Sequence, residues 1–435
     1  MPNSSYFAAT PDGDNIYTVN AAAMKFGVGA LAEIGADAVS LGMKRVVLFT
    51  DANVAATEPA AVATAALKKA GLDVVVFDGC HAEPTDLTIK EATAFCRDGN
   101  FDGYVSLGGG SVMDTAKAAN LFTTWPDDHL AYVNAPIGAA KPVPGPIKPH
   151  IACPTTCGTG SETTGIIVFD LTEIEVKTGI SSNLLKPRMA VVDPTTTDSL
   201  PGGVVASTGF DVLTHAIESY TARPFTTRKR PDHPSQRPPY QGATPYSAIG
   251  SLGAIRIGGA YLARAALDAD DIEARHQLRF AATLAGLAFG SAGVHIPHAM
   301  SYPVSQFNHA YTARGYENAD PMVPHGISVV INAPAAFRFT AQAAPDRHLR
   351  AAEALGADVI AVADADAGEL LATTLIEMMR TTALPSGLAE LGYTDADVPR
   401  MAAAAFAQKR PLAQAPLEIT EDDLAAIYRG AMRYW

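Results

Sequence analysis

The feature that most constrains the fold is an alternation of short β-rich runs and helical stretches over the first two hundred residues. The runs typical of buried strands lie at 46–50, 73–77, 104–107, 150–153 and 189–193, and helical stretches between them lie at 54–70, at 85–97 and from 111 to about 121. Strands and helices that alternate at this spacing predict βαβ units, which build a parallel sheet. We therefore expect an N-terminal α/β domain with a Rossmann-like parallel sheet over residues 1–200.

The second half of the chain differs from the first in composition and in the spacing of its apolar residues. Beyond about residue 201 it is rich in alanine, has few β-branched runs and repeats its apolar residues at helical spacing, as in 271–288 and 364–382. One segment, 223–245, holds six prolines, so it must be a long loop rather than a helix. These patterns predict an all-α C-terminal domain over residues 201–435.

The composition excludes several classes of protein. With 48% hydrophobic and 18% charged residues, the 435-residue chain can bury a large core, which excludes a disordered chain. No uncharged apolar run reaches about 18 residues, so we expect no membrane span. The net charge of −13 argues against a nucleic-acid binder.

Two features favour a cytoplasmic location. Four cysteines in 435 residues do not make a disulfide scaffold, so reduced thiols are the simplest interpretation. No lysine or arginine precedes Lys25, and neither a basic secretory segment nor an arginine-rich transit peptide is visible. We therefore expect the protein to reside in the cytoplasm.

A glycine-rich turn, 108–111, follows the third expected strand. Gly109 and Gly110 let the backbone approach a phosphate closely, and Ser111 with Asp114 resembles a capping box that would fix the start of the next helix. A helix N-terminus offers unpaired N–H groups and the positive end of a dipole to a pyrophosphate. A tight βα turn without a ligand has the same composition, so this turn alone leaves both interpretations open.

A second turn, 154–162, follows another expected strand and supplies hydroxyl groups and small residues that can surround phosphate and ribose. Its hydroxyl groups include those of Thr155, Thr156 and Thr159. Asp51 directly follows the strand at 46–50 and is placed to accept a hydrogen bond from an adenosine ribose, which favours NAD over NADP. A helix N-cap is the competing interpretation of Asp51.

The helical half contains a candidate metal site. Asp211 and His215 stand four residues apart, so both side chains leave one face of a helix about one turn apart. Further histidines lie in apolar settings bounded by glycine and proline, at His295, His298 and His325. One carboxylate with three neutral imidazoles suits Fe²⁺ or Zn²⁺. A helix ion pair would also explain the Asp211–His215 spacing, and spacing does not decide which of His295 and His298 is a ligand.

These motifs together resemble the iron-containing (group III) alcohol dehydrogenase family. The resemblance rests on Gly-Gly-Gly-Ser-x-x-Asp-Thr-x-Lys at 108–117, Pro-Thr-Thr-x-Gly-Thr-Gly-Ser-Glu at 154–162, Gly-Phe-Asp-x-x-x-His-Ala-x-Glu at 209–218 and Pro-His-Gly at 324–326. Their order and spacing match the family over almost the whole chain. The resemblance implies a Rossmann-like domain followed by a helical domain, with NAD and Fe²⁺ as cofactors and Zn²⁺ as the alternative metal.

The resemblance also assigns residues to these two cofactors. The implied metal ligands are Asp211, His215, His298 and His325. The implied NAD-binding residues are Asp51, Gly109, Gly110, Ser111, Asp114, Thr155, Thr156, Thr159 and Lys177.

The sequence departs from the family at one catalytic position. Many relatives carry His-x-x-x-His-Pro, in which the first histidine binds the metal and the second is discussed as a proton relay. Here the first histidine aligns with His298, and Tyr302 replaces the second. Tyr302 or His295 would therefore have to relay protons, unless the relay runs through water.

Within the family, the chain most resembles the branch that transfers hydride between hydroxyacids and oxoacids. The segments that carry this resemblance are 83–86, 113–121, 135–138, 237–242, 292–295, 298–303 and 323–326. The implied reaction oxidises 4-hydroxybutyrate to succinate semialdehyde and passes the hydride, through NAD that stays bound, to an oxoacid such as 2-oxoglutarate. The implied partners are small molecules, and family members are commonly homo-oligomers.

Anionic substrates of this kind need a cationic partner in the protein. The loop at 223–237 holds five arginine and lysine residues against Asp232 alone, so we expect it to bind the substrate carboxylate, with Arg237 as the contact. A solvated basic loop is the competing interpretation.

Three other functions fit parts of the sequence. An alcohol or 4-hydroxybutyrate dehydrogenase of the same family would release NADH at each turnover. A lyase of the dehydroquinate-synthase type shares the two-domain plan, NAD and a metal, but those enzymes typically use a glutamate ligand rather than the Asp211–His215 pair. A non-catalytic dinucleotide sensor would leave the metal constellation unexplained.

Overall fold

The computed structural model describes residues 10–174, 176–308, 310–317 and 321–435. The chain divides into two compact units, one formed by Asn20–Asp198 and the other by Ser199–Trp435 together with residues 10–19. All the strands assigned in the described residues belong to the first unit, and the second is built from helices. The expected class, an α/β part with a parallel sheet followed by a helical part, is therefore confirmed.

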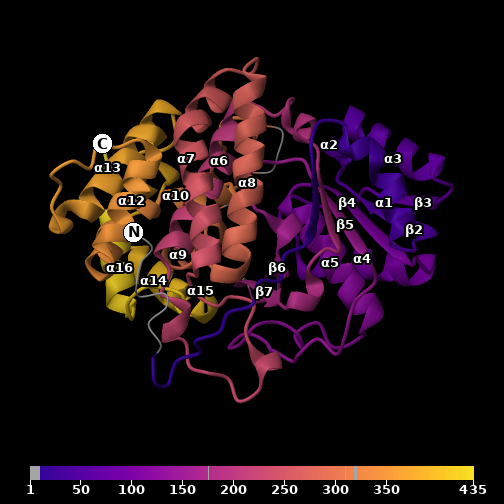
Figure 1. Cartoon of the computed structure of the whole chain (residues 1–435), viewed down its shortest axis with the longest axis horizontal. Helices are drawn as coiled ribbons and strands as arrows, with labels where there is room; N and C mark the ends of the chain where they lie inside the picture. Colours follow the sequence, from indigo (N-terminus) through magenta and orange to yellow (C-terminus); the bar gives the residue numbers. More distant parts are fainter. Residues whose placement is uncertain (1–9, 175, 309, 318–320) are drawn as a thin grey trace. The chain divides into compact units, whose positions relative to one another are not determined.

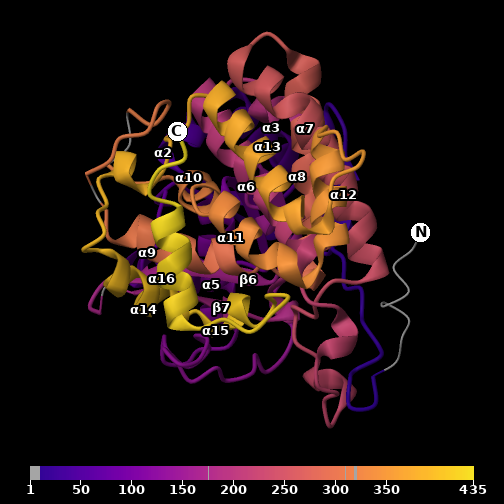
Figure 2. The same ribbon diagram turned by 90° about the vertical axis from the view of Figure 1, so that its left-hand side faces the viewer.

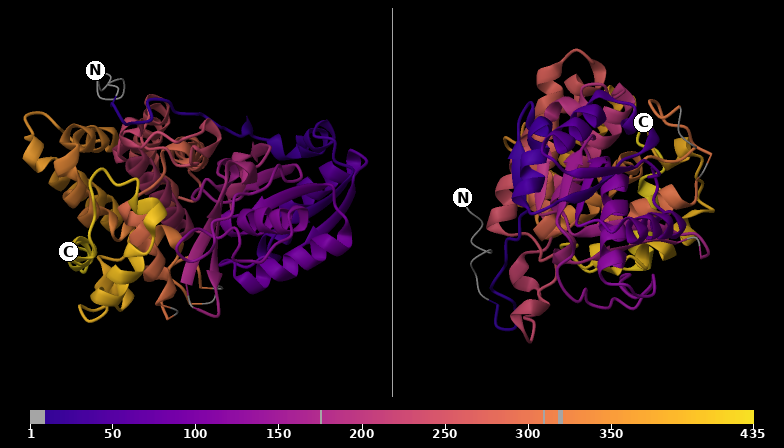
Figure 3. Two further views of the ribbon diagram at one scale, coloured as in Figure 1. Left: turned by 90° about the horizontal axis from the view of Figure 1, so that it is seen from below. Right: turned by 90° about the vertical axis from the view of Figure 1, so that its right-hand side faces the viewer.

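A six-stranded sheet forms the centre of the Asn20–Asp198 unit (Figures 1 and 3). Its strands follow the order β1-β8-β5-β4-β2-β3, and every neighbouring pair is parallel. The strands are β1 (Ala23–Phe26), β2 (Arg45–Phe49), β3 (Asp73–Phe77), β4 (Gly103–Gly108), β5 (His150–Pro154) and β8 (Met189–Val192). Strand β4 is buried along its whole length, as is typical of a central strand in a parallel sheet covered on both faces.

Helices cover both faces of this sheet. They are α1 (Ile34–Ser40), α2 (Ala52–Ala55), α3 (Glu58–Lys69), α4 (Asp86–Gly99) and α5 (Gly110–Thr124). Along β2, Val46 and Leu48 pack into a core shared with α1 and α3, whereas Val47 and Phe49 pack into a core shared with α4 and α5. Successive side chains of a strand point to opposite faces, so this short apolar run builds two cores at once.

Several elements differ from the sequence expectation. The helix expected at 54–70 is two helices, because Thr57 adopts an extended conformation and Pro59 lies in the first turn of α3. Strand β1 was not expected, and neither was the antiparallel hairpin of β6 (Ile166–Leu171) and β7 (Val176–Ser181), which forms a separate two-stranded sheet.

The other unit consists of packed helices, which Figure 2 shows from a second side. They are α6 (Gly202–Thr221), α7 (Pro245–Leu267), α8 (Ile272–Ala292), α9 (Ile296–Gln306), α10 (His325–Val330), α11 (Ala333–Thr340), α12 (Pro345–Leu355), α13 (Ala367–Thr381), α14 (Val398–Phe406), α15 (Lys409–Leu412) and α16 (Glu421–Gly430). Helix α6 packs against α7 and α8 and is buried along almost all of its length from Val205 onward. The proline-rich segment at 223–245 is a loop with two short 3-10 turns, as expected.

Within the described residues, no single helix is long and apolar enough to cross a membrane. Helices α8 and α9 meet the length and composition criteria only as a pair, and this pair is bent by 106°.

Candidate functional site

The two turns expected to bind NAD lie side by side at one edge of the sheet. Strands β4 and β5 are parallel neighbours, and their register pairs Gly108 with Pro154, so the two chains leave the sheet together. The Thr155 N–H donates to the Gly108 carbonyl across 3.0 Å. A Cβ atom on Gly110 would lie 2.7 Å from the side chain of Thr159, so only glycine fits there. This edge borders the point where the strand order reverses between β2 and β4, the usual ligand position in an open α/β sheet.

Helix α5 begins without a side-chain cap. Its N-cap is Gly109, in an extended conformation, which has no side chain to accept a hydrogen bond from the first turn. The expected capping box of Ser111 and Asp114 is therefore wrong: the Ser111 hydroxyl donates to the carbonyl of Ala82 instead. The first N–H groups of an α-helix have no partner within the helix, so this terminus offers donors to an anion.

Asp114 belongs to a buried polar network beneath the turn. Its carboxylate accepts hydrogen bonds from the Ser161 hydroxyl at 2.5 Å and the Val168 N–H at 2.9 Å, and it pairs with Lys117 at 3.3 Å. Lys117 is fully buried; burial lowers its pKa, although the Asp114 carboxylate acts in the opposite direction. The network ties the start of α5 to β6, and its lysine was not assigned a role from the sequence.

Two other expected NAD-binding residues have partners within the protein. Asp51 is the N-cap of α2, and its Oδ1 accepts from the N–H groups of Asn53 and Val54 at 2.9 and 3.0 Å. Both bonds end on Oδ1 of the carboxylate. Lys177, on β7, pairs with Asp170 at 3.0 Å and with Glu83 at 3.6 Å.

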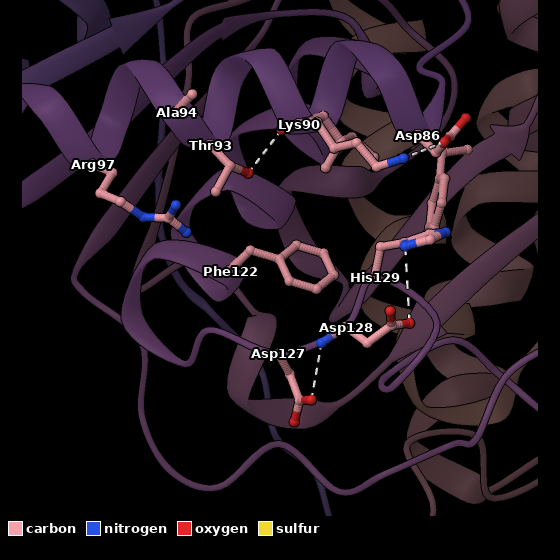
Figure 4. A pocket seen from close by; sticks show the side chains of 11 residues that line it. Asp86, Lys90, Thr93, Ala94, Arg97, Phe122, Asp127, Asp128 and His129 are labelled. Atoms are coloured by element: carbon pink, nitrogen blue, oxygen red, sulfur yellow. Dashed lines mark hydrogen bonds and ion pairs between the residues drawn. The ribbon is translucent and has the colours of Figure 1, made fainter.

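A cavity of about 380 Å³ in the same unit lies apart from these residues (Figure 4). It opens beside α4 and the chain that follows α5, and its lining includes Phe122, Arg97 and Asp127. Lys90 and Asp86 on its wall pair with each other at 2.7 Å. None of the expected NAD-binding residues lines it.

In the helical unit, four side chains from three helices meet at one carboxylate oxygen. Measured to Oδ1 of Asp211, Nδ1 of His215 and Nε2 of His298 each lie at 3.4 Å, and Nε2 of His325 lies at 3.7 Å. Asp211 and His215 leave the same face of α6, His298 comes from α9, and His325 begins α10. The structure thus brings together the four expected metal ligands.

Packing fixes this arrangement. The His215 ring stacks on Phe289 with centroids 4.0 Å apart. Gly326, directly after His325, allows α10 to approach α6, because a Cβ atom there would lie 1.9 Å from the Ser207 carbonyl oxygen. The Pro-His-Gly motif therefore lets a histidine at a helix start reach the carboxylate on another helix.

Unsatisfied polar atoms show that this cluster suits a cation. Asp211 Oδ1, His215 Nδ1 and His298 Nε2 are buried and make no hydrogen bond within the described part of the chain. Each buried polar atom left without a partner costs about 1–3 kcal/mol. Asp211, His298 and His325 offer ligand atoms that all lie within 4.8 Å of one another, so an ion held by them would satisfy Asp211 Oδ1 and His298 Nε2. One oxygen with imidazole nitrogens is a donor set that Fe²⁺ and Zn²⁺ accept.

A further residue, Glu218, orients His298, one of the four expected ligands. Its carboxylate is fully buried, and its Oε1 accepts from the N–H groups of His295 at 2.9 Å and His298 at 3.2 Å. Its Oε2 is hydrogen-bonded to Nδ1 of His298. This contact directs the other nitrogen, Nε2, toward Asp211, as second carboxylates do for metal-binding histidines. The sequence contained the signal, because Glu218 lies on the same helix as Asp211 and His215, seven residues from Asp211.

Near pH 7 two of these groups have the protonation state of a metal ligand, and His298 does not. Burial lowers the pKa of His215 to about 3, so its imidazole is neutral near pH 7. Burial opposes ionisation of Asp211, but His215, His325 and His298 around it hold the pKa of its carboxyl well below the usual range. Burial also opposes the charged form of His298, but the carboxylates of Glu218 and Asp211 outweigh it and raise its pKa to about 9. A metal ion would displace that proton, which makes metal binding pH-dependent.

The two expected proton-relay residues occupy different environments. His295 is fully buried, does not contact Asp211 in any described interaction, and its Nε2 lies 3.0 Å from the Thr221 hydroxyl. Tyr302 lies on α9 four residues after His298, so the two side chains share one face of the helix.

Arg237 has a carboxylate partner within the protein. Its Nε lies 2.8 Å from Oδ2 of Asp14 and its Nη2 lies 3.2 Å from Oδ1. Arg228 of the same loop also binds the Asp14 carboxylate, which is buried. Burial opposes ionisation of Asp14, and the two arginines nevertheless lower the pKa of its carboxyl. Two of the five cations expected to meet a substrate are thus paired with Asp14.

Two protein-family models match the chain. Residues 21–194 match the model described as iron-containing alcohol dehydrogenase. Residues 240–432 match the model of the C-terminal part of the Fe-containing alcohol dehydrogenase family.

Several proteins of similar sequence carry the name hydroxyacid-oxoacid transhydrogenase, mitochondrial. The protein of that name from Bos taurus is 45% identical over 424 residues, which span 97% of this chain and 91% of the relative. The protein from Homo sapiens is 46% identical over 414 residues, 95% of this chain and 89% of the relative. One from Dictyostelium discoideum, named a probable transhydrogenase, is 41% identical and spans 99% of this chain and 81% of the relative.

Two solved structures share the fold. A 1,3-propanediol oxidoreductase has a TM-score of 0.83 at 27% identity and covers 96% of this chain and 100% of its own. A sulfoacetaldehyde reductase from Bifidobacterium kashiwanohense, solved with NAD⁺, has a TM-score of 0.76 at 25% identity and covers 96% of this chain and 98% of its own.

The cytoplasmic location expected from the sequence is wrong on this comparison, because the relatives from cattle, human and Dictyostelium are all named mitochondrial. The inference failed because cysteine content and the position of the first basic residue test for a disulfide scaffold and a basic leader. Neither property reports the compartment in which a folded enzyme works.

Proposed function

Because the chain belongs to the iron-containing alcohol dehydrogenase family, and is therefore an oxidoreductase, we propose that it exchanges hydride between a hydroxyacid and an oxoacid. The proposed reaction converts 4-hydroxybutyrate and 2-oxoglutarate to succinate semialdehyde and 2-hydroxyglutarate. The observation that carries the proposal is the convergence of His215 Nδ1 and His298 Nε2 on Oδ1 of Asp211. The names of relatives at 41–46% identity supply the substrate class.

The residues that would hold the two cofactors lie in the places described above. Asp211, His215, His298 and His325 would hold the metal, which we propose to be Fe²⁺, with Zn²⁺ as the alternative. When bound, the metal polarises the reacting carbon–oxygen bond and NAD carries the hydride.

Different residues would bind different parts of the dinucleotide. The backbone at Gly109, Gly110 and Ser111 would bind the pyrophosphate, and Asp51 would accept from a ribose hydroxyl through Oδ2. The hydroxyl-bearing turn would add Thr155, Thr156 and Thr159. Asp114, which the family also implies, would act by holding the second turn through its contact with Ser161. Lys177, also implied by the family, lies between the carboxylates of Asp170 and Glu83.

We assign the proton relay to Tyr302 rather than to His295. Tyr302 shares a helix face with the ligand His298, whereas Nε2 of His295 is engaged by the Thr221 hydroxyl. The hydroxyl of Tyr302 can accept and donate at the same time, so it can pass a proton between a substrate oxygen and a neighbouring group.

The proposal is tested without free cofactor. Purified protein, freed of small molecules by gel filtration, is incubated with 4-hydroxybutyrate and 2-oxoglutarate, and 2-hydroxyglutarate is measured. We expect product over many turnovers, because NAD stays bound while the hydride arrives from one substrate and leaves to the other. Strict dependence on added NAD would replace the proposal with an ordinary dehydrogenase that releases NADH.

The same proposal includes a homo-oligomeric state and small molecules as the binding partners. Light scattering on the gel-filtered protein measures the oligomeric state, and a monomer at micromolar concentration would contradict this part.

A further inference from the structure

A second cavity of the Asn20–Asp198 unit lies at the end of the sheet opposite to the two turns expected to bind NAD. Its volume is about 690 Å³, and it is lined by Leu41 and by residues of the segments 20–23, 146–149 and 183–188, which lead into β1, β5 and β8. The two turns follow the carboxyl ends of β4 and β5, whereas these segments precede the amino ends of their strands. Strand β5 runs between the two ends over five residues, which is roughly 16 Å at about 3.3 Å per residue. The cavity is therefore separate from the proposed cofactor site.

All the charged residues on the wall of this cavity are cations. They are Lys148, Lys186 and Arg188, and no aspartate or glutamate is among the described residues that line it. Acidic residues outnumber lysine and arginine by 45 to 32 in the whole chain, so a purely basic wall runs against the composition. The cavity beside α4, in contrast, has three aspartates on its wall. The cavity at the amino ends of the strands therefore has a positive potential that suits an anion.

The same dipeptide, Lys-Pro, leads into two neighbouring strands at this cavity. Lys148-Pro149 precedes β5, and Lys186-Pro187 stands just before β8. The parallel register pairs Ile151 with Met189, so each lysine stands three positions before a paired residue. The two lysines thus occupy corresponding places on adjacent chains. Like charges in such places repel each other, and an anion bound between them would remove that repulsion.

Pro187 places Lys186 and Arg188 on the same wall. A residue before a proline is held in an extended conformation, and Lys186 has a φ of −60° and a ψ of 134°. The Arg188 N–H donates to the His150 carbonyl across 2.8 Å, which continues the pairing of β8 with β5 to this position. In an extended chain, residues two positions apart point to roughly the same side. Both cations accordingly line the cavity.

Hydrogen bonds hold the two ammonium groups without cancelling their charge. Nζ of Lys148 donates to the Phe101 carbonyl across 2.5 Å, and Nζ of Lys186 donates to the Asn20 carbonyl. A carbonyl is neutral and an ammonium has three N–H donors, so each lysine keeps its charge and further donors. In the part of the chain that the structure describes, no ion pair involves either lysine or Arg188. Burial lowers the pKa of Lys186 to about 8, and a bound anion would offset this cost of holding the charge away from water.

We propose that this cavity binds a small polyanion, an organic molecule with two or three phosphate or carboxylate groups, through Arg188, Lys186 and Lys148. Arg188 is exposed, and its planar fork of donors can bind one phosphate or carboxylate group through two parallel hydrogen bonds. The lysines supply point charges for the remaining groups. The volume of about 690 Å³ lies within the range of cavities that bind small molecules, about 300–1,000 Å³. The site is additional to the proposed catalytic centre and does not depend on the proposed function.

The test measures the binding of two probes to the full-length protein, loaded with metal and saturated with NAD so that the cofactor site is filled. Fructose 1,6-bisphosphate carries two phosphate groups and tricarballylate carries three carboxylates, and titration calorimetry measures the affinity for each. Arg188→Gln is compared with Arg97→Gln, a matched control that removes an exposed arginine from the wall of the cavity beside α4. We expect at least one probe to bind the wild-type protein. Arg188→Gln should weaken that binding roughly 10- to 100-fold, the range for charged hydrogen bonds, and Arg97→Gln should leave it unchanged.

Two further variants protect the test against misfolding. Lys186→Gln should weaken the binding of the same probe roughly tenfold, the effect of one charged hydrogen bond. Arg188→Lys keeps a cation and should recover part of the affinity lost in Arg188→Gln, and circular dichroism verifies that each variant is folded. Binding of the bisphosphate alone identifies the ligand as a phosphate ester, and binding of tricarballylate alone identifies it as a polycarboxylate. Absence of binding for both probes, or an affinity that Arg188→Gln and Lys186→Gln leave unchanged, overturns the inference.

Discussion

The substitution Glu218→Gln probes the candidate metal centre without touching a ligand. Glu218 is fully buried, accepts two backbone N–H groups through Oε1 and contacts Nδ1 of His298 through Oε2. Glutamine has nearly the same shape. Its carbonyl oxygen can still accept from the two N–H groups, so its NH₂ group must face Nδ1 of His298. That NH₂ group is a donor, and Nδ1 would have to become an acceptor.

The change in the tautomer of His298 determines how far the metal affinity should fall. When Nδ1 of neutral His298 accepts, its proton moves to Nε2, the atom that lies 3.4 Å from Asp211 Oδ1 and would bind the metal. In the variant, the tautomer that can bind metal lacks the charge-assisted hydrogen bond that the Glu218 carboxylate accepts from Nδ1, which is worth about 1.5–3 kcal/mol. We expect metal affinity to fall roughly 10- to 100-fold, the usual effect of a lost carboxylate partner on a metal-binding histidine.

The assay is competition for Zn²⁺ or Co²⁺ between the apoprotein and a chromophoric chelator. Glu369→Gln is the matched control, because that glutamate is an exposed partner of Arg338 in the same unit. Circular dichroism verifies that each variant is folded. Wild-type metal affinity in a folded Glu218→Gln protein would refute the argument that Glu218 orients His298.

Two further predictions concern the other unit. Gly110→Ala should weaken NAD binding at least tenfold, because the new Cβ would lie 2.7 Å from the Thr159 side chain. The double variant Gly110→Ala with Thr159→Ala should recover part of the lost affinity. Fluorescence titration with NADH measures both variants, and unchanged binding in Gly110→Ala would contradict the close packing of the two turns. Asp86→Asn should destabilise the protein by up to about 2 kcal/mol at pH 7 in urea unfolding. Although burial opposes ionisation, Lys90 and Thr172 lower the pKa of Asp86 from 3.8 to about 2, so the stabilisation is present above pH 4 and disappears as the pH falls from 4 to 2. A stability difference that stays constant over that range would contradict it.

The parallel sheet could be predicted because buried strands and helices alternate with little ambiguity. The run Val46–Phe49 reads as a strand at once, since it is apolar on both faces. Strand β1 gives no such signal: only Lys25 of its residues is even partly buried, and pairing with β8 makes it a strand. The hairpin of β6 and β7 depends on a long-range contact as well, because Asp114 on α5 binds the Val168 N–H.

At the candidate metal centre, too, contacts between distant parts of the chain could not be predicted from the sequence. The spacing of Asp211 and His215 predicts two side chains on one helix face, whichever helix packs beside it. The sequence could not decide between His295 and His298, because that depends on which side chain of the α9 region faces α6. In the structure Nε2 of His298 lies 3.4 Å from Asp211 Oδ1, and Glu218 holds His298 by accepting from both backbone N–H groups and by its bond to the His298 ring. The pairing of Arg237 with Asp14 could not be predicted from the sequence either, because the two residues are 223 positions apart in the chain.

The most direct test of the proposed hydride exchange follows a label through the reaction. The protein is given 4-hydroxybutyrate deuterated at C4, unlabelled 2-oxoglutarate and an excess of free unlabelled NADH, and 2-hydroxyglutarate is analysed by mass spectrometry. We predict deuterium at C2 of nearly every product molecule, because the hydride passes through NAD that never leaves the protein. Unlabelled 2-hydroxyglutarate, with deuterium appearing in the free NADH pool, would contradict the account.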